Sequence, residues 1–245
     1  MYRRLMCVDF NGHVATSCWV PYLFRTAVNT DYPTLDNLDL ASKYKGPFQY
    51  MVWRRMFKFI HPVPEPLTFD TSSAHPSLVF SNDLKSVTDS DKPLLVPALE
   101  DSTRFLKCVN VLASQAFYTG RHYWEVWVDK KTKWDIGVAS HIVDRKARVK
   151  LAPKNGYWAI RMIGIHKYVA ATAPWTLLRM DQPLRKIGVF LDCGEEEVSF
   201  FNAEDMVHLF TFNRAKADGF YPFFSTGFND GARNAEPMRI CHITL

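Results

Sequence analysis

The stretch HYWEVWVD, residues 122–129, decides the fold of this chain. Its apolar residues occupy every second position, at Trp124, Val126 and Val128. A period of two places these side chains on one face of an extended strand, because successive side chains of a strand point to opposite faces. The stretch is therefore predicted to be a β-strand with one buried face.

Several later segments are also short, alternating and rich in aromatic residues, and they are separated by turns containing Gly, Asn, Asp or Pro. They are KWDIGVA (133–139), GYWAIRMI (156–163), KIGVFLD (186–192), EVSFFN (197–202) and YPFFSTGF (221–228). Many short strands without long helices between them are typical of an antiparallel sandwich or barrel. We expect an all-β fold, an antiparallel β-sandwich that forms one domain over residues 67–245.

The chain before residue 67 has a different character. Residues 1–46 carry no sustained hydrophobic period and are predicted to be an irregular leader without an assigned fold. Residues 47–66 are predicted to form an amphipathic helix over PFQYMVWRRMFKFI (47–60), followed by a proline-rich linker. Because so short a helix is marginal alone, we expect it to pack on the sandwich.

Composition limits the classes of function. The formal charge of +5 is too small for the protein's size to indicate a nucleic-acid partner. The five cysteines are odd in number and form no C-x-x-C pair, and the sequence has no Asn-x-Ser/Thr sequon. A reduced, cytoplasmic protein is therefore expected. The sequence contains no run of 18 apolar residues, so no membrane span is predicted.

Motifs for catalysis are missing from the sequence. It contains no G-x-S-x-G, P-loop, H-E-x-x-H or G-x-G-x-x-G pattern, and its histidines lack metal-ligand spacing. The consecutive acids Glu195–Glu197 fall in a predicted tight turn, where like charges favour water. We therefore expect no catalytic residue, no metal site and no cofactor, and predict that the chain is not an enzyme.

The order and spacing of these segments resemble the PRY-SPRY (B30.2) domain found in tripartite-motif proteins. LTFDTSSAHPSLVFSNDLKSV (67–87) is similar to the PRY segment. YWEV (123–126), WDIGVA (134–139), GYWAI (156–160), IGVFLDCGEEEVSFFN (187–202) and YPFFSTGFNDG (221–231) are similar to successive SPRY motifs. Two local departures are Thr71 after Asp70, where the family commonly has Pro, and Cys193-Gly194 after Leu191-Asp192.

The resemblance implies a protein-interaction module that recognises a target through loops on one face of the sandwich. Family members use such domains as the substrate-recognition part of E3 ubiquitin ligases or as innate-immunity scaffolds. This sequence shows no RING finger, B-box or coiled coil, so ligase activity would belong to a full-length relative, and a monomer is expected. The chain is alternatively a RING-less isoform or fragment that competes with such a relative.

Matched motif by motif, the resemblance places Asp135, Arg161, Ile163 and Phe228 around the partner-binding pocket. The alternative for Phe228, which lies in TGFNDGARNAEP (226–237), is that it plugs the end of the sandwich. The alternative for Asp135 and Arg161 is an internal ion pair without a ligand role. Close relatives often carry aromatic residues at the positions of Arg161 and Ile163, so a more cationic pocket and an acidic or polar peptide target are expected.

A basic segment between two sheet motifs, DRKARVKLAPK (144–154), extends this hypothesis. The candidate basic rim consists of Arg145, Lys146, Arg148, His166 and Lys167. Such a rim would steer an acidic partner, or bind phosphate or an anionic membrane surface. The alternative is a solvated loop that keeps the protein soluble. A further alternative function is a small-anion sensor, because some butyrophilin-type SPRY domains bind phosphorylated metabolites in a basic pocket.

Overall fold

A computed structural model describes residues 52, 54–56, 59–92, 103–148 and 150–242, together with two short strands near the N-terminus. The chain divides into two compact units, Met1–Val52 and Trp53–Leu245. In the first unit, β1 (Cys7–Val8) and β2 (Val14–Ala15) form an antiparallel pair. The rest of the expected irregular leader lies outside the described residues.

The predicted 47–60 helix is described only in part. Residues 52 and 54–56 are helical, and the chain turns at residue 59. The side chains of Met56, Phe59 and Ile60 are 53%, 84% and 44% exposed. The expected packing of this apolar stripe on the sandwich is therefore not seen in these side chains. Little more than one helical turn is described here, and so short a stretch buries little surface.

The second unit confirms the predicted antiparallel β-sandwich. One sheet has seven strands in the order β13-β12-β11-β6-β15-β4-β3. These strands are β3 (Leu78–Phe80), β4 (Ser86–Asp89), β6 (Arg121–Trp127), β11 (Lys186–Asp192), β12 (Glu197–Asn202), β13 (Val207–Phe212) and β15 (Met238–Cys241). The stretch that decides the fold is the central strand β6, which pairs with both β11 and β15.

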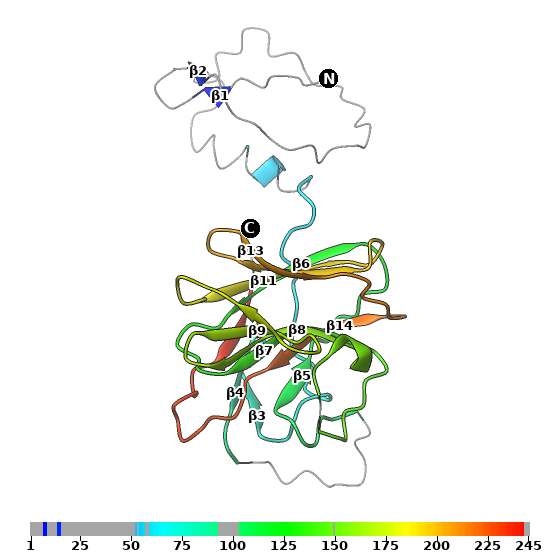
Figure 1. Cartoon of the computed structure of the whole chain (residues 1–245), viewed down its shortest axis with the longest axis vertical. Helices are drawn as coiled ribbons and strands as arrows, with labels where there is room; N and C mark the ends of the chain where they lie inside the picture. Colours follow the sequence, from blue (N-terminus) through cyan, green and yellow to red (C-terminus); the bar gives the residue numbers. More distant parts are fainter. Residues whose placement is uncertain are drawn as a thin grey trace. The chain divides into compact units, whose positions relative to one another are not determined.

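The other sheet has six strands in the order β10-β9-β8-β7-β14-β5. They are β5 (Asn110–Leu112), β7 (Trp134–Ser140), β8 (Tyr157–Gly164), β9 (Lys167–Ala170), β10 (Thr176–Leu178) and β14 (Phe220–Ser225). Figure 1 shows β6 and β11 of the first sheet stacked against β7, β8 and β9 of the second. A single turn of 3-10 helix, Pro153–Asn155, precedes β8.

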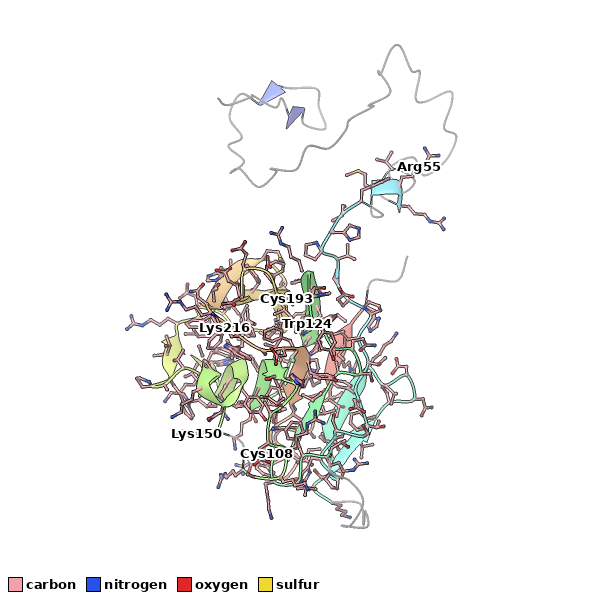
Figure 2. The ribbon with its side chains drawn as sticks, turned by 90° about the vertical axis from the view of Figure 1, so that its right-hand side faces the viewer. Arg55, Cys108, Trp124, Lys150, Cys193 and Lys216 are labelled. Atoms are coloured by element: carbon pink, nitrogen blue, oxygen red, sulfur yellow. The ribbon has the colours of Figure 1, made fainter. Side chains whose placement is uncertain are left out.

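The main core lies between the two sheets and contains the residues predicted from the period of two. Trp124, Trp134 and Trp158 are at most 3% exposed, and Trp124 lies within the sandwich in Figure 2. Ile187, Val189 and Leu191 of β11 are fully buried in the same cluster. Burial of such large apolar side chains provides the main drive for folding.

A second, smaller core covers part of the outer face of the six-stranded sheet. Phe105, Leu151, Tyr157 and Phe223 pack there with Leu112 and several alanines. Phe105 and Leu151 come from loops rather than strands, so these parts of the two loops lie over the sheet. This second layer explains why β7 is buried on both faces rather than alternating cleanly.

Candidate binding site

A cavity of about 1010 Å³ opens beside this second core. Its walls come from the ends of β7 and β8, the loops that contain Lys107 and Lys146, Trp175, and the start of the 226–237 loop. The lining side chains include Lys107, Cys108, Lys133, Asp135, Lys146, Arg148, Lys150, Leu151, Arg161, Ile163, Trp175 and Phe228. Figure 2 shows Cys108 and Lys150 on the same side of the domain.

An ion pair forms the floor of the cavity. Asp135 of β7 and Arg161 of β8 are direct partners in the strand register. Arg161 Nε donates to Asp135 Oδ1 at 2.6 Å, and Arg161 Nη2 lies 3.3 Å from Oδ2. The two side chains are 15% and 24% exposed. Burial raises the pKa of the Asp135 carboxyl, and the Arg161 charge opposes this shift.

Two exposed aromatic side chains border the floor. The guanidinium carbon of Arg161 lies 5.1 Å from the centre of the Trp175 ring, within the range of a cation–π contact. Trp175 follows β9 and is 52% exposed, and Phe228 is 62% exposed. Because Phe228 is open to solvent, it does not plug the end of the sandwich. Ile163 is half-buried beside them.

Cationic side chains line the wall that is formed by the loops beside the second core. Lys107, Lys146, Arg148 and Lys150 line the cavity and are exposed. In the ranges that the structure describes, these four side chains make no ion pair. Lys133 differs, because its ammonium group lies 3.2 Å from the Asp230 carboxylate. The free positive charge of the cavity therefore lies mainly on the two loops beside the second core.

The sequence-based site residues are brought together in large part. Asp135, Arg161, Ile163 and Phe228 all line the cavity. The ion pair that was considered as the alternative for Asp135 and Arg161 is present, and it forms the floor of this same cavity.

The predicted basic rim is only partly at the cavity. Lys146 and Arg148 line it. Arg145 instead donates to the Thr103 carbonyl oxygen at 2.8 Å and lies over the Phe105 ring, so it holds one loop against another. His166 lies in the turn between β8 and β9, and Lys167 is the first residue of β9; both are outside the residues that line the cavity.

Sequence reasoning missed three contributors. No periodic pattern surrounds Trp175, so the sequence does not assign it to the site. Lys107 comes from a loop far from the basic segment in the sequence, and only the fold brings the two together. Asn234, which is 3% exposed and organises the 226–237 loop, resembles any other turn-forming asparagine in the sequence. A buried asparagine is recognised only through its hydrogen-bond partners.

The described residues contain neither a metal-binding cluster nor a membrane-spanning helix. Within them, no group of three or more His, Cys, Asp or Glu side chains is placed to share a metal ion. No helix in the described part of the chain has the length and apolar character needed to cross a bilayer.

Known proteins resemble this chain both in sequence and in fold. Residues 121–239 match the SPRY domain family, and residues 67–117 match the SPRY-associated domain family. The chain is 39% identical over 218 residues to nuclear factor 7, brain, from Xenopus laevis, which covers 89% of this chain and 36% of that relative. It is 40% identical over 200 residues to E3 ubiquitin-protein ligase TRIM69 from Rattus norvegicus, covering 82% of this chain and 40% of the relative.

A solved structure has a similar fold. The crystal structure of the TRIM65 PSpry domain aligns with a TM-score of 0.62 at 19% identity, over 82% of this chain and 98% of that one. The chain spans 36% and 40% of the length of the two curated relatives above. The two matched families, the relatives and the two-sheet sandwich together show that this chain belongs to the PRY-SPRY family of tripartite-motif-type proteins.

Proposed function

We propose that this PRY-SPRY domain captures an acidic protein segment in the cavity between Trp175 and Phe228. The family membership makes a protein-binding module the coarse function. The observation that supports the finer proposal is the coincidence of exposed aromatic side chains with unpaired cations in one cavity. Aromatic anchors supply most of the binding energy at protein interfaces, and complementary charge adds association rate and specificity.

The charges decide which partner class fits. Asp135 neutralises Arg161, so the floor offers little net charge to a ligand. Lys107, Lys146, Arg148 and Lys150 are left to meet a partner. The four cations create a positive potential in the cavity. A partner rich in Asp or Glu is therefore favoured over a basic one. An apolar side chain of the partner would insert between Trp175 and Phe228.

The biological setting proposed for this capture is substrate recognition in the cytoplasm. One relative is named an E3 ubiquitin-protein ligase, and this chain matches 40% of that relative's length. We place the present domain in the role of target recognition for a ligase of this type or for an innate-immunity scaffold. No catalytic group is assigned to it, and no metal or cofactor is needed for docking.

The unpaired cations also favour a second candidate function, a sensor of small phosphorylated anions. Lys146, Arg148 and Lys150 are close enough in sequence for one phosphate-bearing ligand to contact more than one of them. Calorimetry with pyrophosphate separates the candidates. Heat at micromolar pyrophosphate that disappears in K146E/R148E would favour the sensor, whereas no heat at millimolar pyrophosphate would exclude it.

Affinity capture with the full chain tests the leading proposal. The wild type, F228A, the charge-reversed K146E/R148E, and a control variant V207A would each be immobilised and exposed to cell extract. Val207 is 51% exposed on β13 of the other sheet, so it offers a matched exposed apolar side chain away from the cavity. The proposal expects partners lost by the two cavity variants and kept by V207A. Retention by all variants would refute it.

A further inference from the structure

The loop that carries Phe228 is held by one buried side chain, Asn234. Its Nδ2 group lies within hydrogen-bond distance of three carbonyl oxygens, those of Thr226 at 2.8 Å, Phe228 at 3.0 Å and Lys133 at 3.2 Å. Its Oδ1 accepts from the backbone N–H groups of Thr132 at 2.9 Å and Lys133 at 3.3 Å. The amide thus joins the β6–β7 turn to both sides of Phe228.

Two further buried groups fix the same loop to the sandwich. The N–H of Asn229 donates to Asp89 Oδ2 at 3.0 Å, and Asp89 belongs to β4 in the PRY segment. The ammonium group of Lys131 donates to the carbonyl oxygens of Asn234 at 3.2 Å and Glu236 at 3.0 Å. Lys131 is 4% exposed. The loop is therefore tied to the sandwich at both of its ends.

The loop needs such external bonds because its backbone is unfavourable. Asp230 and Ala232 have φ values of 59° and 69°, in the left-handed region that residues with a Cβ avoid. Gly227 and Gly231 also have positive φ, at 65° and 64°. Without its hydrogen bonds, this segment would relax to other conformations, since strained backbone persists only where the surrounding structure determines it.

The side chain of Phe228 contributes little to its own placement. It is 62% exposed, so packing does not hold the ring over the cavity. The backbone must place it, and the carbonyl group of Phe228 is itself bonded to Asn234. An aromatic anchor that is held in place before binding loses less entropy when the partner arrives.

We infer that Asn234 is a positioning residue that strengthens partner binding by fixing the backbone of Phe228 at the cavity rim. The inference rests on the proposed function for its consequence in binding. Its structural part, the ordering of Phe228, stands apart from any partner. Asn234 is not expected to touch the partner, because it is buried beneath the loop.

A fluorine probe tests the ordering directly. The full chain would carry a single 4-fluorophenylalanine at position 228 and be observed by ¹⁹F NMR, with N234A compared to the unchanged chain. One narrow resonance is expected for the unchanged chain, and a shifted and broadened or split resonance for N234A. R233A is the matched control, because Arg233 is exposed and, among the described residues, bonds only to Asp230 within the loop. An unshifted narrow resonance in N234A would overturn the inference.

A second variant covers the case in which N234A does not fold. Asn234→Asp keeps the size of the side chain and both acceptor bonds, but it loses the donors to the three carbonyl oxygens. Broadening at position 228 is expected here too, while a fluorine probe at position 201, on β12 of the other sheet, keeps its resonance. Equal changes at positions 228 and 201 would show general destabilisation and would also overturn the inference.

The binding consequence is measured with the proteins captured by the wild type. Asn234→Ala is expected to weaken capture about tenfold, the loss typical of removing an interface anchor. F228A should weaken it equally, and the double variant no further. Additive losses would contradict the inference. If F228A alone has no effect on capture, the proposed function fails, and the fluorine result still judges the ordering of the loop.

Discussion

The floor and the rim of the cavity are built in different ways. The floor belongs to β7 and β8, where the sheet ladder fixes the backbone and an ion pair joins Asp135 to Arg161. The rim belongs to the 226–237 loop, where no ladder exists and the amide of Asn234 holds the chain. The floor is therefore part of the folded core, whereas the rim depends on a few polar bonds.

This difference separates stability from recognition. Changes in the floor should lower the free energy of unfolding, because they disturb β7 and β8, two strands in the interior of the six-stranded sheet. Changes at the exposed tip of the rim should leave folding intact and alter binding. Loops on a rigid scaffold can vary in this way without cost to the fold.

The largest expected effect comes from adding one methyl group to β7, the strand that carries Asp135 of the floor. A Cβ at Gly137 of β7 would lie 2.0 Å from the Trp158 carbonyl oxygen, so β7 and β8 would have to separate. Gly137→Ala is expected to lower the free energy of unfolding by about 3 kcal/mol or more, at the upper end of overpacking effects. Gly164→Ala on β8 is the control, because nothing lies within 4 Å of its Cβ position. Similar urea midpoints for both variants would contradict this prediction.

The next effect comes from breaking the ion pair. Asp135→Ala or Arg161→Ala leaves a half-buried charge without its partner, and each should cost about 2 kcal/mol, less than for a fully buried pair because solvent screens both groups. The double variant should cost less than the sum, as contacting residues couple. The exposed Lys216–Glu196 pair, at 3.6 Å, is the control and should show almost no coupling. Additive losses for Asp135 and Arg161 in denaturant titrations would show that the floor pair is not formed.

Phe228→Ala should affect binding without affecting folding. The ring is mostly exposed, so the free energy of unfolding should change by at most about 0.5 kcal/mol. Binding to the captured partner should weaken about tenfold, the size of an anchor's contribution. Calorimetric unfolding and surface plasmon resonance on the same samples would measure both quantities. A large loss of stability in F228A would place the ring in the core and remove the distinction between floor and rim.

A pH dependence is expected at the base of the rim. Burial lowers the pKa of Lys131 from 10.5 to about 8. Between these values the unfolded chain binds the proton more tightly, so the contribution of Lys131 to stability rises as pH increases from about 8 to about 10.5. The difference in unfolding free energy between the wild type and Lys131→Met should therefore move in favour of the wild type over this range. A flat or opposite trend would show that Lys131 is solvated.

The sequence predicted the floor better than the rim, for physical reasons. The period of two in residues 122–129 and 133–139 reports burial directly, so strands, core tryptophans and the sandwich followed from it. Asp135 and Arg161 came with strand motifs similar to those of a known family, and the register made them partners. The full burial of β7 was harder to foresee, because the second core is built by loops distant in sequence.

The rim could be predicted only in part. Phe228 was predicted through the resemblance of YPFFSTGFNDG (221–231) to a SPRY motif, but the hydrogen bonds of Asn234 reach back about 100 residues to the β6–β7 turn. The joining of Lys107 to the basic segment likewise depends on tertiary contacts. The expected packing of the 47–60 helix was not seen in its described side chains, since a hydrophobic stripe shows which face is apolar without naming what covers it.

Site-specific photo-crosslinking tests the central claim, that the cavity rim is the partner-binding surface, most directly. Benzoylphenylalanine would replace Phe228 in one sample of the full chain and Val207, on β13 of the other sheet, in a second. After irradiation with captured partners, we predict a crosslinked species from position 228 that disappears when K146E/R148E is added. Position 207 should give none. Crosslinks of equal yield at both positions, or from position 207 alone, would contradict the account.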